Sequence, residues 1–281
     1  MSEIVALDAA WMRAHQLPEP GDEGKHGRGQ VLVVGGDAEL AGAAMLAGVA
    51  ALRAGAGKLQ VAVAEASVPV LSVALPEARV LGLPRDAAGA AAGLVAQHAM
   101  RCDALLIGPG MMDDADGLAA ALLDLDTRGG VVVDAGALLA IPSAGPRPGR
   151  VLTPNAGEMA RLLDMAKDQV TSDPLAAAQV TARQFDATVV MKGAVTFVVG
   201  VDGQAGRFAG GGPGLGVSGS GDVLGGLITG LLARGAPPFA AAAWGVFLHG
   251  EGGARLAARI GKLGYLAREI ADEAPPILSS F

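Results

Sequence analysis

Short and long apolar runs alternate along the chain. Runs of four or five residues rich in Val, Leu and Ile, such as 30–34, predict buried strands. The longer runs of small apolar residues between them, such as 41–54, exceed the usual length of a strand and predict helices. Repeated strand–helix units are typical of an α/β fold, with a mostly parallel central sheet covered by helices on both faces.

We expect the remaining elements from the same pattern, in a single domain of residues 1–281 that begins with an arm at 1–23. The expected strands are 58–64, 104–107, 130–133, 151–153 and 188–191, followed by a hairpin of 195–199 with 205–208. The expected helices are 41–54, 87–100, 115–125, one that carries Glu158 to Leu163, one that begins at Asp173-Pro174, and then 223–233, 239–258 and 262–271.

Composition and charge exclude several classes of protein. Of the 281 residues, 51% are hydrophobic and 17% are charged, which excludes a disordered chain. The net charge is −7 and no basic run occurs, so we expect no nucleic-acid partner. Cys102 is the single cysteine, which excludes an internal disulfide framework and a zinc cluster. No apolar run reaches the length of a membrane helix, and we expect a cytoplasmic protein with no membrane partner.

Polar and glycine-rich segments follow the expected strands. The carboxyl ends of parallel strands meet at one edge of a sheet, where ligands bind in α/β proteins. We therefore expect these segments to line one crevice. They are Gly35-Gly36, Gly108-Pro109-Gly110, Asp134-Ala135-Gly136, Thr153-Pro154-Asn155 and Lys192-Gly193.

The most informative segment is the glycine-rich loop of residues 210–222, which leads into the expected helix 223–233. The first N–H groups of a helix have no partner within it, so this loop predicts a site for an anion such as a phosphate. Asp222 stands where the loop meets the helix, and as a base it could take the proton of a hydroxyl that attacks this phosphate. The alternative is that Asp222 only caps the helix. The spacing of the loop fits neither a dinucleotide fingerprint nor a P-loop.

Other polar residues have two interpretations each. Asn155 and Glu158, three residues apart at a helix start, could hold Mg²⁺ through waters or form a capping box. Lys192 could lie beside the phosphates of a nucleotide, although a lone lysine after a strand is usually solvated. His249, in an apolar helix, is more typical of a hydrogen-bonded core histidine than of a catalytic one, and Cys102 is interpreted as structural.

The ordered set of motifs resembles the ADP- or ATP-dependent NAD(P)H-hydrate dehydratases, which belong to the ribokinase-like superfamily. The similarity extends from about Lys25 to about Pro275. It is carried by Gly42-Ala43-Ala44, residues 51–57, Ile107 to Gly110, Asp134 to Leu138, Leu152-Thr153-Pro154, Gly157-Glu158, Lys192-Gly193, Pro213-Gly214-Leu215, Gly219 to Leu224 and Leu248-His249-Gly250.

This resemblance implies a three-layer α/β/α ribokinase-like fold and a repair reaction. The substrate is NADH or NADPH hydrated at ring carbon 6, whose hydroxyl is phosphorylated before phosphate leaves. It also implies Mg²⁺, with ADP or ATP as phosphoryl donor, and a homo-oligomer. In the catalytic roles that the resemblance implies, Asp222 is the base and the amides of Gly219, Ser220 and Gly221 stabilise the phosphoryl group. The implied nucleotide-binding residues are Lys192, Gly193, Ala194, Val195, Thr196 and Gly221. The implied substrate-binding residues are Ala43, Gly110, Asn155 and Asp222, and the implied metal-binding residue is Glu158.

The chain departs from the usual family pattern at several positions. Asn155 stands where the family usually has His, and Gly212 stands where the family usually has Asn. The residue before Lys25 is usually His in the family and is Gly24 here. The residue before Ser218 is commonly small or hydroxyl-bearing in the family and is Val217 here. Because of Asn155, a vitamin kinase of the same superfamily, acting on hydroxymethylpyrimidine or hydroxyethylthiazole, is the alternative enzyme. A nucleotide-binding protein without turnover is the alternative of a different class.

Overall fold

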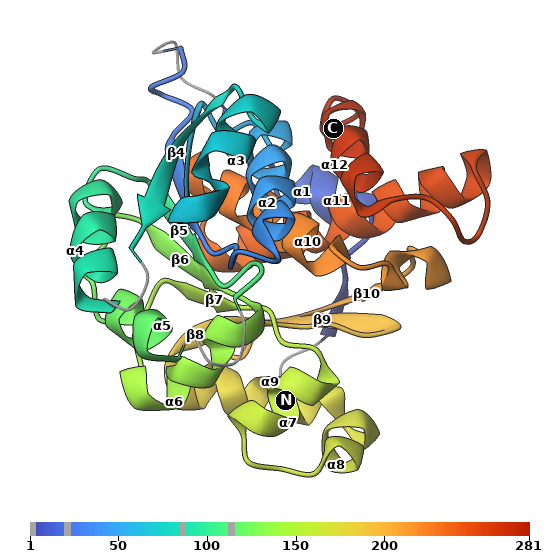
Figure 1. The fold of residues 1–281 in the computed structure, drawn as a ribbon. Coiled ribbons are helices and arrows are strands. Elements are labelled where there is room, and N and C mark those ends of the chain that lie inside the picture. The colour runs from blue at the N-terminus through green and yellow to red at the C-terminus, as the bar shows by residue number, and fades with distance from the viewer. Residues whose placement is uncertain (1–3, 20–23, 85–87, 112–115) are drawn as a thin grey trace.

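The computed structural model describes residues 4–19, 24–84, 88–111 and 116–281. Its centre is a ten-stranded sheet in the order β1-β10-β9-β8-β7-β6-β5-β2-β3-β4, and only β9 runs antiparallel to its neighbours (Figure 1). The strands are β1 (Ile4–Ala6), β2 (Gln30–Val34), β3 (Lys58–Ala64), β4 (Ala78–Leu83), β5 (Ala104–Ile107), β6 (Gly130–Val133), β7 (Arg150–Leu152), β8 (Ala187–Met191), β9 (Val195–Val199) and β10 (Ala205–Ala209).

Two hydrophobic cores lie on opposite faces of this sheet. Successive side chains of a strand point to opposite faces, so Val31 and Val33 of β2 enter one core and Leu32 and Val34 enter the other. All four are fully buried. An apolar run without alternation, covered on both sides, is what a central parallel strand requires.

Each core is closed by its own layer of helices, which confirms the predicted three-layer α/β/α fold (Figure 1). The first layer contains α1 (Ala9–Ala14), α2 (Ala41–Arg53), α3 (Val68–Ala74), α10 (Ser220–Ala233), α11 (Pro238–Arg259) and α12 (Ala267–Leu278). The second contains α4 (Ala88–Ala99), α5 (Asp116–Leu123), α6 (Ile141–Ala144), α7 (Ala156–Leu162), α8 (Lys167–Ser172) and α9 (Pro174–Phe185). None of the helices in the described ranges is long and apolar enough to cross a membrane.

The last helix differs from the prediction. The expected helix at 262–271 is wrong, because the chain between α11 and α12 has left-handed backbone at Gly261 (φ 142°) and Gly264 (φ 100°). Helix α12 instead begins at Ala267, where the Glu269 carboxylate accepts a hydrogen bond from the N–H of Leu266. Helix α10 also begins earlier than expected, at Ser220, so Asp222 lies inside its first turn.

The part of the expected N-terminal arm that the structure describes belongs to the sheet and to one core. Strand β1 pairs in parallel with β10, and Trp11 and Met12 of α1 are buried. Asp8 starts α1 by accepting hydrogen bonds from the N–H groups of Ala10 and Trp11. The sequence pattern did not predict these elements, nor α3 and β4.

The strand order reverses between β2 and β5. From β2 the chain proceeds outward through β3 and β4, then returns to β5 on the other side of β2 and continues toward β8. The loops after β2 and β5 therefore diverge at the carboxyl edge, which is where α/β sheets form ligand crevices. They remain joined by backbone hydrogen bonds from the N–H of Gly36 to the Pro109 carbonyl (2.7 Å) and from the N–H of Asp37 to the Gly110 carbonyl (3.1 Å).

Helices α2 and α10 are in unusually close contact. A Cβ atom at Gly226 of α10 would collide with the backbone of Ala47, and one at Gly230 with the backbone of Ala51. The absence of side chains at these two positions allows the two helix backbones to touch. This contact fixes α10, whose first turn faces the site described below.

We expect Gly226→Ala to lower the free energy of unfolding by about 2–4 kcal/mol, because backbone must shift to admit the new methyl group. Gly93→Ala is the matched control, since a Cβ there meets nothing within 4 Å. That control should raise stability by about 0.5–1 kcal/mol, through the helix preference for Ala over Gly. Urea unfolding of both variants tests this, and equal effects would refute the close contact.

Candidate active site

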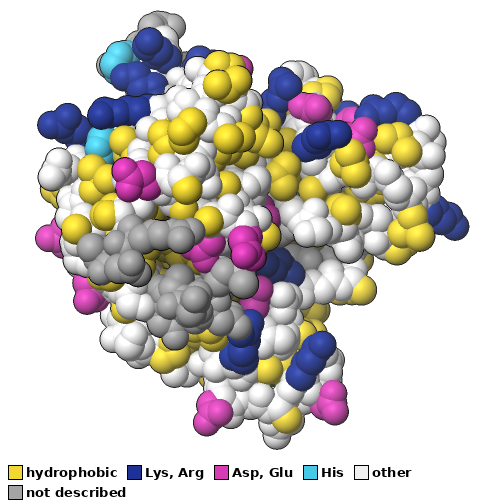
Figure 2. Space-filling view, in the orientation of Figure 1, with side chains coloured by type: hydrophobic (Ala, Val, Ile, Leu, Met, Phe, Trp, Pro, Cys, Tyr) yellow, Lys and Arg dark blue, Asp and Glu magenta, His cyan; other side chains and the backbone are white. Residues whose placement is uncertain are grey.

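A cavity of about 910 Å³ opens beyond the carboxyl ends of β6, β7 and β8 and extends to the start of α10. In the space-filling view, Lys or Arg and Asp or Glu side chains gather in a hollow between the main body and the helices α7 to α9 (Figure 2). The cavity wall combines the strand-end loops with the glycine-rich segment 210–221 and with α11. The predicted crevice is confirmed for the segments that follow β6, β7 and β8, whereas Gly35-Gly36 and Gly108-Pro109-Gly110 do not line this cavity.

Most of the predicted site residues line this cavity. They are Asn155, Glu158, Lys192, Gly193, Ala194, Thr196, Gly219, Ser220, Gly221 and Asp222. Val195, Ala43 and Gly110 do not line it. Ala43 and Gly110 lie beside each other at the β2–β5 switch point, where a Cβ at Gly110 would come 3.0 Å from that of Ala43.

The first turn of α10 presents its backbone to the cavity. The residue before the helix, Gly219, has φ 89°, in the left-handed region that favours glycine, and a Cβ there would meet a methyl group of Leu46 at 2.6 Å. No side chain caps this helix start. The N–H of Ser220 donates to the Val217 carbonyl at 3.2 Å, whereas the N–H groups of Gly221 and Asp222 have no partner among the described residues. These two N–H groups and the positive end of the helix dipole are therefore available to an anion.

Asp222 lies in this first turn with an unusual protonation equilibrium. Burial and the nearby Asp134 carboxylate raise the pKa of Asp222 to about 7, although Lys192 opposes the shift. The cap position belongs to Gly219, which argues against the interpretation that Asp222 only caps the helix. A carboxylate with a pKa near 7 in a cavity is suited to accept a proton at neutral pH.

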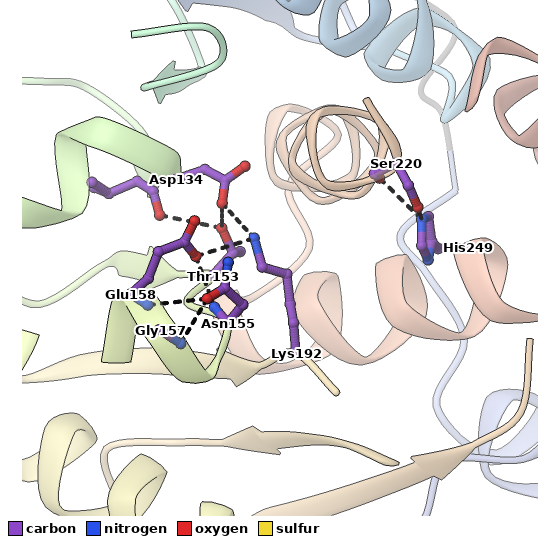
Figure 3. Close-up of polar contacts among 9 residues, drawn as sticks. Asp134, Thr153, Asn155, Gly157, Glu158, Lys192, Ser220 and His249 are labelled. Atoms are coloured by element: carbon purple, nitrogen blue, oxygen red, sulfur yellow. Dashed lines mark hydrogen bonds and ion pairs between the residues drawn. The ribbon is translucent and has the colours of Figure 1, made fainter. Parts of the chain in front are cut away.

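Lys192, just after β8, is held between two carboxylates (Figure 3). Its Nζ lies 2.8 Å from Asp134 Oδ1 and 3.6 Å from Glu158 Oε2. Its side chain is only 20% exposed, which argues against the alternative of a solvated lysine at this position. Burial lowers the pKa of Lys192, but the attraction of Asp134 and Glu158 outweighs it and raises the pKa above its usual value. The ammonium group thus stays charged.

The loops that carry this ion pair are tied to one another. Asp134 Oδ1 also accepts a hydrogen bond from Thr153 Oγ1 at 2.7 Å, which links the end of β6 to the end of β7. The N–H of Lys192 donates to the Pro154 carbonyl at 2.8 Å, which links β7 to β8. Asp134 is 3% exposed and therefore almost wholly buried.

Asn155 and Glu158 form the capping box that begins α7. Asn155 Oδ1 accepts hydrogen bonds from the N–H groups of Gly157 and Glu158, and Glu158 Oε2 accepts one from the N–H of Asn155 at 2.7 Å (Figure 3). The same Oε2 faces Lys192. The capping interpretation is confirmed, and it places Glu158 in the ion-pair cluster at the same time.

Two residues of the site escaped the sequence analysis. Asp134 was noted only as part of a loop, although an aspartate directly after a buried strand at the carboxyl edge is the signal that marks it. His249 of α11 is hydrogen-bonded, as predicted, but it also lines the cavity beside Ser220. Burial lowers the pKa of His249 to about 4, so its ring is neutral at pH 7.

Cys102 is buried and does not line this cavity. Its sulfur accepts from the side-chain amides of Gln30 and Gln60, and burial raises the pKa of its thiol to about 11. A thiol with such a pKa is inert at neutral pH, as the structural interpretation predicts.

The described residues contain no group of three or more His, Cys, Asp or Glu side chains arranged to hold a metal ion. Two carboxylate oxygens of the cavity residues already have partners: Glu158 Oε2 serves Asn155 and Lys192, and Asp134 Oδ1 serves Thr153 and Lys192. A dedicated protein cage for Mg²⁺ is therefore absent from the described part of the chain, whereas Mg²⁺ commonly binds through waters and phosphates.

Comparison with known families decides the classification. A family model described as NAD(P)H-hydrate dehydratase matches residues 31–276. The chain belongs to the NAD(P)H-hydrate dehydratase family. This membership confirms the resemblance of the motifs and does not favour the vitamin kinases as the alternative enzyme.

Curated members of the family are similar over nearly the whole chain. An ADP-dependent (S)-NAD(P)H-hydrate dehydratase of Xanthomonas campestris is 48% identical over 98% of this chain and 96% of its own length. One of Neisseria meningitidis is 35% identical over 88% of this chain and 83% of its own. The bifunctional NAD(P)H-hydrate repair enzyme of Moorella thermoacetica is 38% identical, and this chain spans 53% of its length.

Solved structures agree with this classification. An ADP/ATP-dependent NAD(P)H-hydrate dehydratase of Bacillus subtilis, co-crystallised with ATP and Mg²⁺, superposes with a TM-score of 0.84 at 26% identity, covering 100% of this chain and 99% of that one. A ribokinase-like protein of Enterococcus faecalis gives a TM-score of 0.82 at 26% identity, with 94% and 91% covered. Hydroxyethylthiazole kinase of Pyrococcus horikoshii shares the fold, with a TM-score of 0.59 at 18% identity and 90% and 89% covered.

The protonation of Asp222 predicts a pH-dependent cost to stability. Its pKa is raised in the folded state, so between pH 4 and 7 the native protein holds more protons than the unfolded chain, and the free energy of unfolding falls as pH rises through this window. Asp222→Asn removes that loss. We expect the variant to gain about 1–3 kcal/mol relative to the parent between pH 5 and pH 8.

Urea unfolding at the two pH values measures this difference. Asp168→Asn, at an exposed position in α8, is the control and should follow the parent at both pH values. A difference between Asp222→Asn and the parent that stays constant with pH would contradict the shifted protonation.

Proposed function

We propose that this chain restores NADH and NADPH from their hydrated forms, using ADP or ATP as the phosphoryl donor. The observation that carries the proposal is the placement of Asp222, a base with a pKa near 7, in the first turn of α10 and in the same cavity as Lys192. This arrangement offers both a base for a hydroxyl and cationic and amide partners for a phosphate. Membership of the dehydratase family supports the choice of substrate.

The first chemical step is phosphoryl transfer. Asp222 takes the proton of the hydroxyl on ring carbon 6, and the oxygen then attacks the terminal phosphoryl group of the nucleotide. A new O–P bond forms as the bond to the leaving AMP or ADP breaks. The N–H groups of Gly219 and Gly221, together with Lys192, would face the negative charge that spreads over the phosphoryl oxygens. The N–H of Ser220 donates to the Val217 carbonyl at 3.2 Å, so Ser220 would act through its side chain.

The second step is elimination. Phosphate leaves ring carbon 6 with the electron pair of the C–O bond, and the lone pair of the ring nitrogen assists its departure. Loss of a proton from carbon 5 restores the double bond of the reduced nicotinamide. Phosphate is a far better leaving group than hydroxide, which explains why a kinase-like site serves a dehydration.

The remaining roles follow from position. Gly193, Ala194, Val195 and Thr196 continue from Lys192 and would hold the nucleotide, and Gly221 leaves space for its phosphates. Ala43 and Gly110, at the switch point, and Asn155 would border the hydrated ring. Asn155 is committed to the capping box, so its contribution would come from its amide nitrogen.

Mg²⁺ would enter bound to the nucleotide phosphates, with Glu158 contacting one of its waters through Oε1, the oxygen that the capping box does not use. When bound, the ion would neutralise charge on the phosphates. The homo-oligomer and the cytoplasmic location remain predictions.

A direct assay follows the absorbance of reduced nicotinamide after hydrated NADH is mixed with the protein, Mg²⁺ and either ADP or ATP. We expect turnover with at least one nucleotide, and kcat/KM should rise about tenfold per pH unit below pH 7 and level off above it, because Asp222 must be ionised to act as base. Asp222→Asn should lose at least about 100-fold in kcat.

The nucleotide that supports turnover identifies the donor. Absence of turnover with both nucleotides would refute the proposal, and the alcohols that vitamin kinases phosphorylate would then be tested. Binding of nucleotide without turnover of either substrate class would favour the non-catalytic alternative.

Gly221→Ala separates stability from nucleotide binding. A Cβ at Gly221 would meet Lys192 Nζ at 3.5 Å and Asp134 Oδ2 at 3.8 Å, which are ordinary contacts, so the fold accepts the methyl group while the cavity loses space. We expect an unchanged or slightly raised melting temperature, since Ala favours the helix. The KM for nucleotide should rise about tenfold or more, equivalent to about 1.4 kcal/mol.

Melting curves and nucleotide titrations of the variant measure the two effects. A Gly221→Ala protein that binds nucleotide as tightly as the parent would place the phosphates elsewhere.

A further inference from the structure

His249 contacts the start of α10 through a single ring nitrogen. Its Nε2 lies 2.8 Å from Ser220 Oγ and 3.0 Å from the Ser220 backbone carbonyl oxygen (Figure 3). Helix α11, which carries His249, packs against α10, so the ring approaches the first turn of α10 from a neighbouring helix. Ser220 is 4% exposed, and both residues line the cavity.

The two contacts together settle which atoms carry hydrogen. A carbonyl oxygen has no proton and can only accept, so Nε2 must bear the hydrogen at this distance. The ring is neutral at pH 7, because burial lowers its pKa to about 4, and its single N–H is therefore on Nε2. Both oxygens of Ser220 lie within hydrogen-bonding distance of that N–H, so Ser220 Oγ accepts from it in this tautomer.

The hydroxyl hydrogen of Ser220 is consequently free. Serine in a helix often donates back to a carbonyl one turn earlier, but this residue stands at the first position of α10. Within the described residues, Ser220 Oγ has no hydrogen-bond partner other than His249. The acceptor of the hydroxyl must therefore come from the cavity.

We infer that His249 is a positioning residue: as the neutral Nε2–H tautomer it fixes Ser220 Oγ as its acceptor, so that the Ser220 hydroxyl donates its hydrogen to a phosphoryl oxygen bound at the start of α10. Ser220 then contributes through its side chain, because its backbone N–H donates to the Val217 carbonyl at 3.2 Å. Without the ring, the hydroxyl would be free to rotate and would serve the anion only part of the time. The inference rests on the proposed function for the identity of the anion as a transferring phosphoryl group.

The tautomer is tested without any activity measurement. The parent protein is labelled with ¹⁵N at histidine, and long-range ¹⁵N–¹H correlation spectra at pH 7 show which ring nitrogen is protonated, with His249→Gln used to assign the signal. We expect a neutral ring protonated on Nε2 that stays neutral down to about pH 5. A ring protonated on Nδ1, or a doubly protonated ring at pH 7, would overturn the inference.

The positioning role is tested by a double-mutant cycle in the dehydration assay with saturating nucleotide. Ser220→Ala and His249→Leu should each lower kcat by about 10–100-fold, at or below the roughly 100- to 1,000-fold effect of losing one oxyanion donor, because the backbone N–H groups of Gly219 and Gly221 remain. The double variant should be no more than about threefold worse than Ser220→Ala, because His249 acts through Ser220. His249→Gln, which retains an N–H near the position of Nε2, should recover kcat to within about fivefold of the parent.

His98→Leu, in α4 and outside the cavity, is the matched control and should leave kcat unchanged. Circular dichroism and melting curves identify a variant that fails to fold, and His249→Gln keeps the test open if His249→Leu does. Independent, multiplicative losses in the double variant, or a folded His249→Gln without recovery, would refute the positioning role. If the parent protein itself lacks dehydratase activity, the proposed function fails, while the tautomer measurement still decides the state of His249.

Discussion

The site depends on one buried charge, the ammonium group of Lys192, which is held between Asp134 and Glu158. A lysine with so little contact with water is stable only when carboxylates balance it. Asp134 follows β6, Glu158 lies in the first turn of α7 after β7, and Lys192 follows β8. The three charged groups therefore join the segments that follow β6, β7 and β8, and all three line the cavity.

The same ion pair sets the chemistry of its neighbour. Asp222 faces Asp134 as well as Lys192, and burial together with carboxylate repulsion keeps its pKa near 7 rather than near 4. The cavity thus holds more acidic than basic groups before any ligand arrives. A nucleotide brings further negative charge, which explains why the amides at the start of α10 and a metal ion carried by the phosphates would be needed to accept it.

The sequence predicts the layers of the fold because its central strands, such as 30–34, are uninterrupted apolar runs. It does not predict β1, which has three residues, or α3, which leaves Val70 and Val73 exposed and so lacks a clear apolar face. Asp222 is predictable because a glycine-rich loop directly before a helix is a local sequence pattern that indicates an anion site. The pairing of Lys192 with Asp134 joins residues 58 positions apart, and it depends on β6, β7 and β8 lying side by side, which no local pattern reveals.

The backbone contact between α2 and α10 limits how this site can change. Gly226 and Gly230 lock α10 onto α2, whose first turn carries Ala43 at the switch point. Helix α2, which would border the substrate at Ala43, and helix α10, which would bind the phosphate, are therefore held together by direct backbone contact. A shift of one of these helices would require a shift of the other.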